Sequence, residues 1–118
     1  MERSSLEVVR GTLDVLILKT LSWGPLHGYS IVQSIHHQTG EALLVEEGAL
    51  YPALYRMEAK GWIEAEWGLS GNNRRAKYYR LMPDGRRRLR LEVKTWGDYT
   101  EAVNKVLGAV AKPQWEKG

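Results

Sequence analysis

The chain has 118 residues, of which 43% are hydrophobic and 26% charged, and its formal net charge is +3 at pH 7. This length fits one domain, or one domain with an appended element. The longest apolar run, residues 15–18, is far too short to span a membrane, and the sequence shows no signal-peptide pattern. Because cysteine is absent, disulfides and thiolate metal sites are excluded, which fits a cytoplasmic protein.

Charge is distributed unevenly along the chain. Residues 1–67 contain five Lys or Arg and nine Asp or Glu, whereas residues 68–118 contain twelve Lys or Arg and five Asp or Glu. Eight of the basic residues fall in the segment from Arg74 to Arg90, where Asp84 is the one acidic residue. Such a basic segment indicates a polyanionic partner such as nucleic acid, although a solvated helix face has the same composition.

The first 40 residues predict a loose N-terminal arm followed by two helices. We expect residues 1–10 to form the arm, with some helical tendency. Thr12 is a suitable N-cap for the first helix, which the segment Trp23-Gly24-Pro25 ends. Its inward stripe recurs at helical spacing, at Leu13, Leu16, Ile17 and Leu21. The second helix should run from about residue 27 to residue 39, stop at Gly40, and bury Tyr29, Val32 and Ile35.

A third helix is predicted from about residue 47 to residue 60. Leu50, Leu54 and Met57 recur at helical spacing and should face the core, and Gly61 provides the stop. Pro52 has no backbone N–H, so we expect it in the first helical turn, where that N–H would have no helical partner. The other faces would present Ala49, Tyr51, Ala53 and Arg56.

After the third helix the hydrophobic period changes to two, which predicts a β-hairpin. Ile63, Ala65 and Trp67 share one face of the first strand. A loop rich in Gly and Asn, residues 68–73, precedes a second alternating segment, residues 74–81. A helix followed by such a hairpin is typical of a winged helix, with the basic wing at about residues 68–77, although a hairpin tip can be polar for solubility alone.

The last long segment predicts one helix over residues 83–112. Pro83 suits the first helical position, and about 28 residues make a rod of roughly 40 Å. Apolar positions follow the spacing of a coiled-coil seam, at Leu89, Val93, Trp96, Thr100, Val103, Leu107 and Val110. This seam favours a second copy of the chain as partner, although the stripe could also cover its own domain. We therefore predict an α+β, mostly helical fold with a winged helix-turn-helix domain at residues 1–82 and a C-terminal dimerisation helix at residues 83–112.

Four motifs in this order resemble the PadR-like transcriptional regulators. They are RGTLD at residues 10–14, GPLHGY at 24–29, GALYPAL at 48–54 and RRAKYYRL at 74–81. The resemblance extends from about residue 10 to residue 90 and implies a bacterial, homodimeric winged-helix repressor that binds an inverted-repeat operator. The chain is similar to the shorter branch of the family, with one C-terminal helix. Two positions depart from the family pattern, because Ala49 replaces a frequent Ser or Thr and Met82 replaces a frequent capping Thr.

The residues and the resemblance together predict contacts with double-stranded DNA. Tyr51, Arg56 and the backbone at Gly48 and Ala49 would enter the major groove. The start of the second helix would hold a phosphate through His27, Gly28 and Tyr29. The wing would contribute Asn73, Arg74, Arg75 and Lys77. Glu46 and Glu47 would repel phosphate if they faced it, and Tyr51 could instead be a packed aromatic residue.

Enzymatic activity, metal sites and cofactors are not expected. His36 and His37 are adjacent and would point about 100° apart on a helix, which disfavours a metal site with Glu46 and Glu47. The sequence contains no nucleophile–base pairing and no glycine-rich phosphate loop. An alternative function is a module that binds a protein or senses a small aromatic effector, in which Trp96 and Tyr99 line an apolar slot at the dimer interface. Aromatic residues on such a seam are also frequent as plain core.

Overall fold

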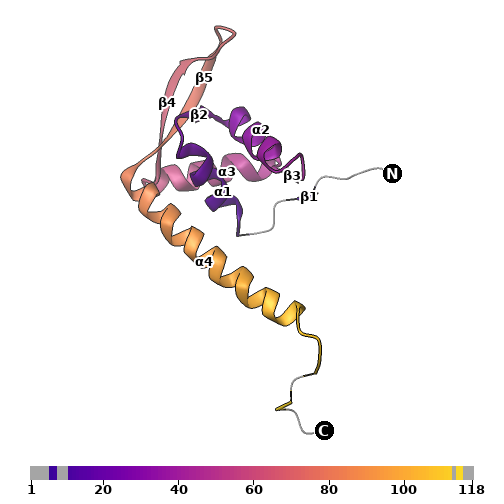
Figure 1. The fold of residues 1–118 in the computed structure, drawn as a ribbon. Helices are drawn as coiled ribbons and strands as arrows, with labels where there is room; N and C mark the ends of the chain where they lie inside the picture. The colour runs from indigo at the N-terminus through magenta and orange to yellow at the C-terminus, as the bar shows by residue number, and fades with distance from the viewer. Residues whose placement is uncertain (1–5, 8–10, 113, 116–118) are drawn as a thin grey trace, which may run out of the picture.

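The computed structural model describes residues 6–7, 11–112 and 114–115, which form four helices and five strands (Figure 1). The elements are β1 (Leu6–Glu7), α1 (Leu13–Leu21), β2 (Leu26–His27), α2 (Gly28–Gln38), β3 (Leu43–Leu44), α3 (Glu47–Ala59), β4 (Ile63–Leu69), β5 (Arg75–Leu81) and α4 (Pro83–Leu107). The α+β winged-helix fold is thereby confirmed, with three short helices, a hairpin and one long C-terminal helix.

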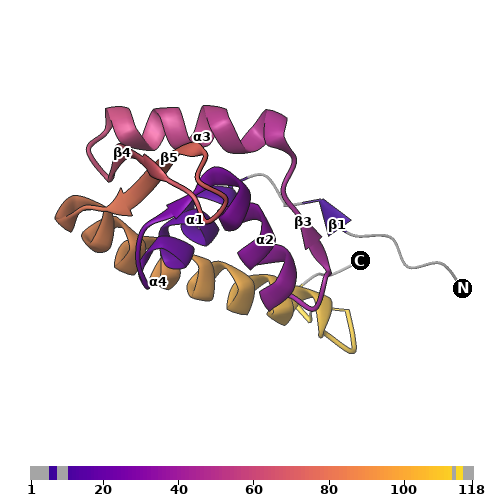
Figure 2. The same cartoon turned by 90° about the horizontal axis from the view of Figure 1, so that it is seen from above.

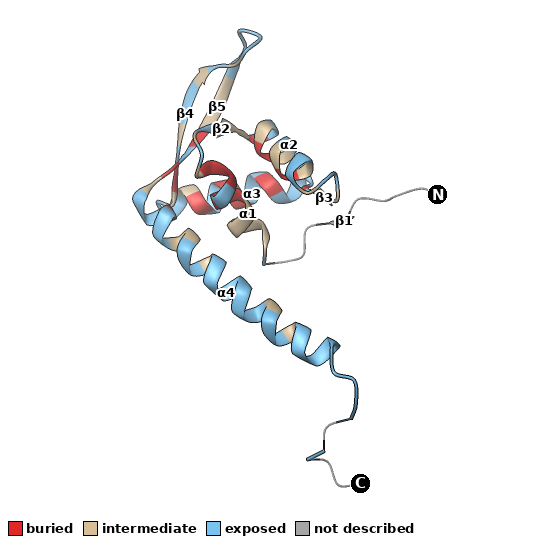
Figure 3. Ribbon diagram, in the orientation of Figure 1, coloured by how far each residue is buried: buried red, intermediate tan, exposed pale blue. Residues whose placement is uncertain are grey.

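The hydrophobic core lies where α1, α2 and α3 meet the base of the hairpin. Its fully buried large side chains are Ile17, Leu18, Leu21, Ile31, Leu50, Leu54, Met57 and Ile63. The inward positions of α3 are thus those that its spacing predicts. Ala53 is buried as well, contrary to the expectation, because it lies three residues after Leu50 and four before Met57, on the same side of α3. In Figure 3 the buried stretches of α1, α2 and α3 lie where the three helices come together.

The second helix buries Ile35 as predicted and leaves Val32 half-buried against the core, but Tyr29 is exposed and Ile31 is buried in its place. Tyr29 is 62% exposed, whereas Ile31 is fully buried and Ile35 is buried beside it. Since Ile31 and Ile35 are one turn apart, they define the inward face of α2. Tyr29 lies two residues before Ile31, about 200° around the helix, and therefore points outward.

Two small sheets complete the domain. In the three-stranded sheet, β5 is the central strand and pairs antiparallel with both β2 and β4. The hairpin register runs from Ile63 opposite Leu81 to Leu69 opposite Arg75. In the other sheet, β1 pairs parallel with β3. The strand at residues 6–7 corrects the helical tendency expected for the N-terminal arm, whose remaining residues lie outside the described ranges.

The C-terminal helix begins as predicted but ends earlier. Pro83 is its first residue and Met82 is the N-cap, without a side-chain capping bond. The 25 residues of α4 correspond to about 37 Å, and the helix ends at Leu107 with Gly108 as its C-cap. Val110 was expected on the helical seam, but it lies beyond the helix and is fully exposed. None of the described helices has both the length and the hydrophobicity needed to cross a lipid bilayer.

The arrangement of the elements separates two exposed regions. Figure 1 shows the hairpin and α4 leaving the helical domain in opposite directions. Seen from above, α3 and α4 lie on opposite sides of α1 (Figure 2), and both contact it. The surface of α3 and the hairpin is therefore distinct from the surface of α4.

Candidate nucleic-acid interface

The exposed side of α3 is rich in aromatic side chains and open backbone. Tyr51 is 47% exposed and Tyr55, one turn later, is 78% exposed. At the start of the helix, Gly48 and Ala49 are exposed, and Glu46 occupies the N-cap with extended backbone. Burial of the other face fixes this orientation, so α3 exposes its first turns to solvent.

Pro52 lies deeper in α3 than expected. Because the helix begins at Glu47, Pro52 is its sixth residue and belongs to the second turn. A residue here would normally donate its N–H to the carbonyl of Gly48, four residues earlier. Proline has no N–H, so the exposed Gly48 carbonyl oxygen lacks its usual helical donor. It can accept a hydrogen bond from outside the helix.

The N-terminus of α2 packs against Tyr51. His27 is the N-cap of α2, and its Nδ1 accepts a hydrogen bond from the backbone N–H of Ser30 at 3.3 Å. A Cβ atom at Gly28 would lie 2.8 Å from the Tyr51 hydroxyl oxygen and 3.0 Å from its ring. The tyrosine ring therefore rests on the glycine backbone, and the absence of a side chain at Gly28 permits this close approach.

The hairpin carries basic and aromatic side chains at its tip. The loop between β4 and β5 is closed by a hydrogen bond from Ser70 N–H to the carbonyl of Arg74 at 2.7 Å, and Asn73 adopts a positive φ of 62°. The Arg75 guanidinium lies over the Trp67 indole, 4.6 Å from the ring centroid. This stacking holds one arginine against the hairpin surface.

These elements enclose a concave surface, here called the wing concavity, of about 500 Å³. It lies between the hairpin, the start of α2 and Tyr51. The residues expected to contact DNA that line it are His27, Gly28, Tyr29, Tyr51, Arg74, Arg75 and Lys77. Four expected residues, Gly48, Ala49, Arg56 and Asn73, are exposed but do not line it. Residues up to 52 positions apart in the sequence, from His27 to Tyr79, thus meet at one site.

Two basic residues of the predicted interface have carboxylate partners within the chain. The Arg56 guanidinium donates a hydrogen bond to Asp14 of α1 and forms an ion pair with it. Lys77 Nζ lies 3.8 Å from the Glu58 carboxylate. Among the described residues, Arg74 and Arg75 have no such partner. The positive charge of the wing concavity therefore resides mainly in these two side chains.

Trp67 and Tyr79 also line the wing concavity but were not among the expected site residues. Burial raises the pKa of the Tyr79 hydroxyl, and the Glu58 carboxylate and Tyr51 raise it further. Tyr79 is therefore a neutral hydroxyl near pH 7. Arg75, Lys77 and Tyr79 are two apart on β5 and share a face, and Trp67 is the partner of Lys77 on β4, so the period of two and the hairpin register could have indicated both positions.

The predicted dimer residues lie along α4, except Val110, which lies beyond its end. Leu89 packs partly against the core, whereas Val93 is 52% exposed, Trp96 is 45% exposed and Leu107 is 76% exposed. Thr100 and Val103 are partly buried, and the Thr100 hydroxyl donates to the Trp96 carbonyl at 3.0 Å. The rings of Trp96 and Tyr99 are 6.2 Å apart.

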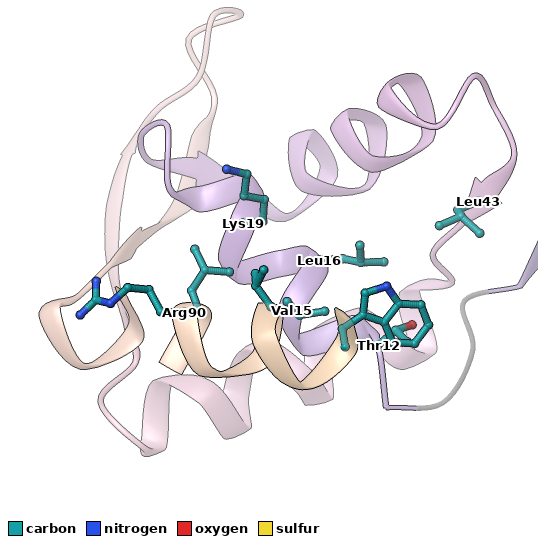
Figure 4. Close-up of a pocket in the computed structure, with 9 residues that line it drawn as sticks. Thr12, Val15, Leu16, Lys19, Leu43 and Arg90 are labelled. Atoms are coloured by element: carbon teal, nitrogen blue, oxygen red, sulfur yellow. The ribbon is translucent and has the colours of Figure 1, made fainter. Parts of the chain in front are cut away.

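An apolar groove of about 750 Å³ separates α1 from the first half of α4 (Figure 4). Its lining residues are Thr12, Val15, Leu16, Lys19, Leu43, Leu89, Arg90, Val93 and Trp96. Three of the predicted dimer residues thus form one wall of this groove. Tyr99, the other expected effector residue, lines a smaller neighbouring hollow together with Trp96.

The sequence matches a family model described as transcriptional regulator PadR-like family, over residues 17–91. The chain belongs to this PadR-like family. Members of this family are transcriptional regulators, so the wing concavity and α3 are parts of such a regulator.

Individual relatives of this PadR-like protein agree with the assignment. A transcriptional regulator from Clostridium thermocellum is 32% identical, with a TM-score of 0.75 over 82% of this chain and 91% of that chain. A PadR family transcriptional regulator from Eggerthella lenta is 35% identical, with a TM-score of 0.71 over 83% of each chain. An uncharacterised protein X of Lysinibacillus sphaericus is 33% identical over 98 residues, which are 83% of this chain and 90% of that protein.

The contact between Gly28 and Tyr51 can be tested by a double-mutant cycle on stability. Gly28→Ala should lower the free energy of unfolding by about 1–3 kcal/mol, because the new Cβ displaces the Tyr51 ring. In a Tyr51→Ala background this cost should disappear. Chemical denaturation at one fixed protein concentration measures both values.

Gly48→Ala is the matched control for the Gly28 cycle. A Cβ at Gly48 meets no atom within 4 Å, so this change should stabilise the protein by roughly 0.5–1 kcal/mol. An equal cost of Gly28→Ala in both backgrounds would show that the glycine does not seat the tyrosine.

Proposed function

We propose that the protein is a homodimeric, sequence-specific DNA-binding repressor that recognises an inverted-repeat operator. In this proposal α3, the start of α2 and the hairpin β4–β5 form the reading head of each protomer. The observation that supports it most directly is the wing concavity, which combines Arg74 and Arg75 with aromatic side chains beside an exposed helix start. Unpaired arginines at such a site favour a polyanion, because neutralising phosphates releases counterions.

Each part of the reading head has a separate role in the proposed complex. The start of α3 enters the major groove, where the open Gly48 carbonyl accepts from a base amino group and Ala49 packs against base edges. The Tyr51 hydroxyl and the N-terminal amides of α2, at His27, Gly28 and Tyr29, hold a phosphate. The wing residues Asn73, Arg74, Arg75 and Lys77 follow the backbone into the minor groove.

Arg56 has a different role in this proposal from the base or phosphate contact expected of it. Its ion pair with Asp14 joins α3 to α1. We propose that Arg56 holds α3 at a fixed angle to α1. The partly exposed geometry of this pair is consistent with a modest stabilising effect. Base contacts in this proposal then come from the start of α3, at the Gly48 carbonyl and Ala49.

The homodimer is supported by the apolar side chains that α4 leaves uncovered. Val106 and Leu107 are each 76% exposed on the half of α4 that extends beyond its own domain. The other half borders the open apolar groove against α1. Two copies related by a two-fold axis can place the extending half of each α4 against the groove of the other, which buries both.

DNA binding predicts a specific effect of the wing arginines on salt dependence. In the Arg74→Ala, Arg75→Ala double variant, affinity should fall, and the slope of log affinity against log salt should become shallower by up to about 4 for a dimer that loses four phosphate contacts. Fluorescence anisotropy at several salt concentrations, on duplexes selected from a random pool, measures both quantities.

Arg80→Ala is the control for the arginine experiment, because Arg80 lies on the same strand but is paired with Glu64 at 2.8 Å and does not line the wing concavity. Its slope should equal that of the unmodified protein. A double variant with an unchanged slope would remove the wing from the DNA interface.

The dimer predicts that a charge on the seam separates the protomers. Val103→Asp should raise the dimer dissociation constant at least about 100-fold, because an unpaired carboxylate in an apolar interface costs several kcal/mol. Analytical ultracentrifugation measures the association state, and circular dichroism checks that α4 remains helical. Ala102→Asp adds the same charge one residue away, off the seam, and should leave the dimer intact; dissociation in both variants, or in neither, contradicts the assigned seam.

A second candidate function is regulation by a small aromatic effector. The groove between α1 and α4 (Figure 4) supports it, because its lining is largely apolar. Trp96, one of the lining residues, offers a flat ring for stacking. In the proposed dimer the partner would close this groove, and a ligand would bind between the two protomers.

Effector binding predicts a fluorescence signal that depends on one tryptophan. Titration with a planar dye such as acridine should change the tryptophan fluorescence, and Trp96→Ala should abolish the change while the dimer persists. Trp23→Ala is the control, since Trp23 is exposed near the end of α1 and does not line this groove. No change in the unmodified protein would argue that the groove is filled by dimer contacts.

A further inference from the structure

The start of α4 makes an unusually close contact with the reading head. Gly85 is the one residue of α4 that is buried. A Cβ atom built at Gly85 would overlap the backbone carbonyl oxygen of Trp62 and lie 2.7 Å from Leu81 Cδ1. The obstacle is backbone rather than a flexible side chain, so it cannot be moved aside by a rotamer change.

Trp62 connects three elements at this point. Its N–H donates to the Met57 carbonyl of α3 at 3.0 Å, and its carbonyl accepts from the Met82 N–H, at the start of α4, also at 3.0 Å. Two cations contact its indole ring, with Lys60 Nζ 4.8 Å and Arg88 Cζ 5.0 Å from the ring centroid. Trp62 is thereby held by the end of α3 on one side and by the first turns of α4 on the other.

We infer that the Gly85–Trp62 contact sets the angle between α4 and the reading head, and through it the distance between the two reading heads of a dimer. This inference rests on the proposed homodimer and makes Gly85 a positioning residue for operator spacing. A two-fold dimer reads two half-sites whose separation must match that of its recognition helices. Gly85 contacts no partner itself, and its effect passes through the direction of α4.

The expected effect of filling this contact follows from simple geometry. To accept a methyl group at Gly85, the first turn of α4 must move by about 1 Å, which over one 5.4 Å turn is a tilt of roughly 10°. Carried along about 30 Å of α4, this tilt displaces the reading head relative to the far end of α4 by roughly 5 Å. Since base pairs are spaced about 3.4 Å apart, the preferred half-site spacing should change by about one to two base pairs.

Spin labels can measure the distance between reading heads without DNA. The chain contains no cysteine, so Glu66→Cys on the exposed side of β4 places one nitroxide on each hairpin of the dimer. Pulsed dipolar spectroscopy should give one narrow distance in this parent. Adding Gly85→Ala should shift that distance by roughly 3–6 Å.

Gly97→Ala is the matched control, because Gly97 lies on the same helix and a Cβ there meets no atom within 4 Å. It should leave the distance unchanged. An unshifted distance in a folded, dimeric Gly85→Ala protein overturns the inference, as does an equal shift in Gly97→Ala.

A second variant keeps the test decisive if Gly85→Ala does not fold. Arg88→Ala removes one of the two cations that flank Trp62 without introducing an overlap, so it should broaden the distance distribution. Arg88 also pairs with Glu92 at 2.7 Å, and Glu92→Gln controls for loss of that pair. A distribution as narrow in Arg88→Ala as in Glu92→Gln overturns the inference.

Selection on DNA then separates this inference from the proposed function. A duplex pool with two selected half-sites and a variable spacer should give one preferred spacing for the unmodified protein, and a spacing changed by about one to two base pairs for Gly85→Ala. If the unmodified protein selects no DNA, the repressor proposal fails while the label distances still decide the role of Gly85. An unchanged spacing despite a shifted label distance overturns the link to the operator.

Discussion

Leu50, Ala53, Leu54 and Met57 pack on the domain core, and this contact determines which side of α3 is exposed to solvent. The four side chains lie within two turns of the helix, so rotation of α3 about its axis would expose them to water. Full burial of one such side chain contributes about 1.5–3 kcal/mol. The exposed positions of Gly48, Ala49, Tyr51 and Tyr55 are therefore a consequence of hydrophobic burial on the opposite side.

The distribution of ion pairs determines where the positive charge remains. Arg56, Lys77, Arg80, Arg87 and Arg88 each have a carboxylate partner within the chain. These pairs are largely solvent-exposed and add little stability, but they lower the local positive potential. Among the described residues, Arg74 and Arg75 at the hairpin tip have no carboxylate partner, so the wing is the part of the reading head that attracts phosphate most strongly.

Sequence patterns predicted the elements well, because each pattern reflects local physics. The apolar period of α3, the stop at Gly61 and the change to a period of two at Ile63 all appear in the structure. Where prediction failed, the outcome depended on tertiary contacts. The exposure of Tyr29 depends on which face of α2 meets the core, and the partner of Arg56 lies 42 residues away.

The candidate site was predictable only in part for the same reason. The basic wing and the motif around Gly28 are visible in sequence, whereas the seating of Tyr51 on Gly28 requires two helices to be brought together. Gly85 was even less accessible to prediction. A glycine inside a helix indicates only a residue of low helix propensity. Nothing in the neighbouring sequence indicates that the Trp62 carbonyl occupies the space where a side chain at residue 85 would lie.

Helix α1 lies between the two surfaces that the proposals assign to DNA and to an effector. Val15, Leu16 and Lys19 line the groove against α4, while Asp14 holds Arg56 of α3. A molecule in the groove and a duplex on α3 would thus act on opposite sides of one nine-residue helix. Thermodynamic reciprocity then applies. An effector that lowers the affinity for DNA is itself bound with lower affinity by the DNA-bound protein. Promoter occupancy would in that case set the concentration at which the cell detects the compound.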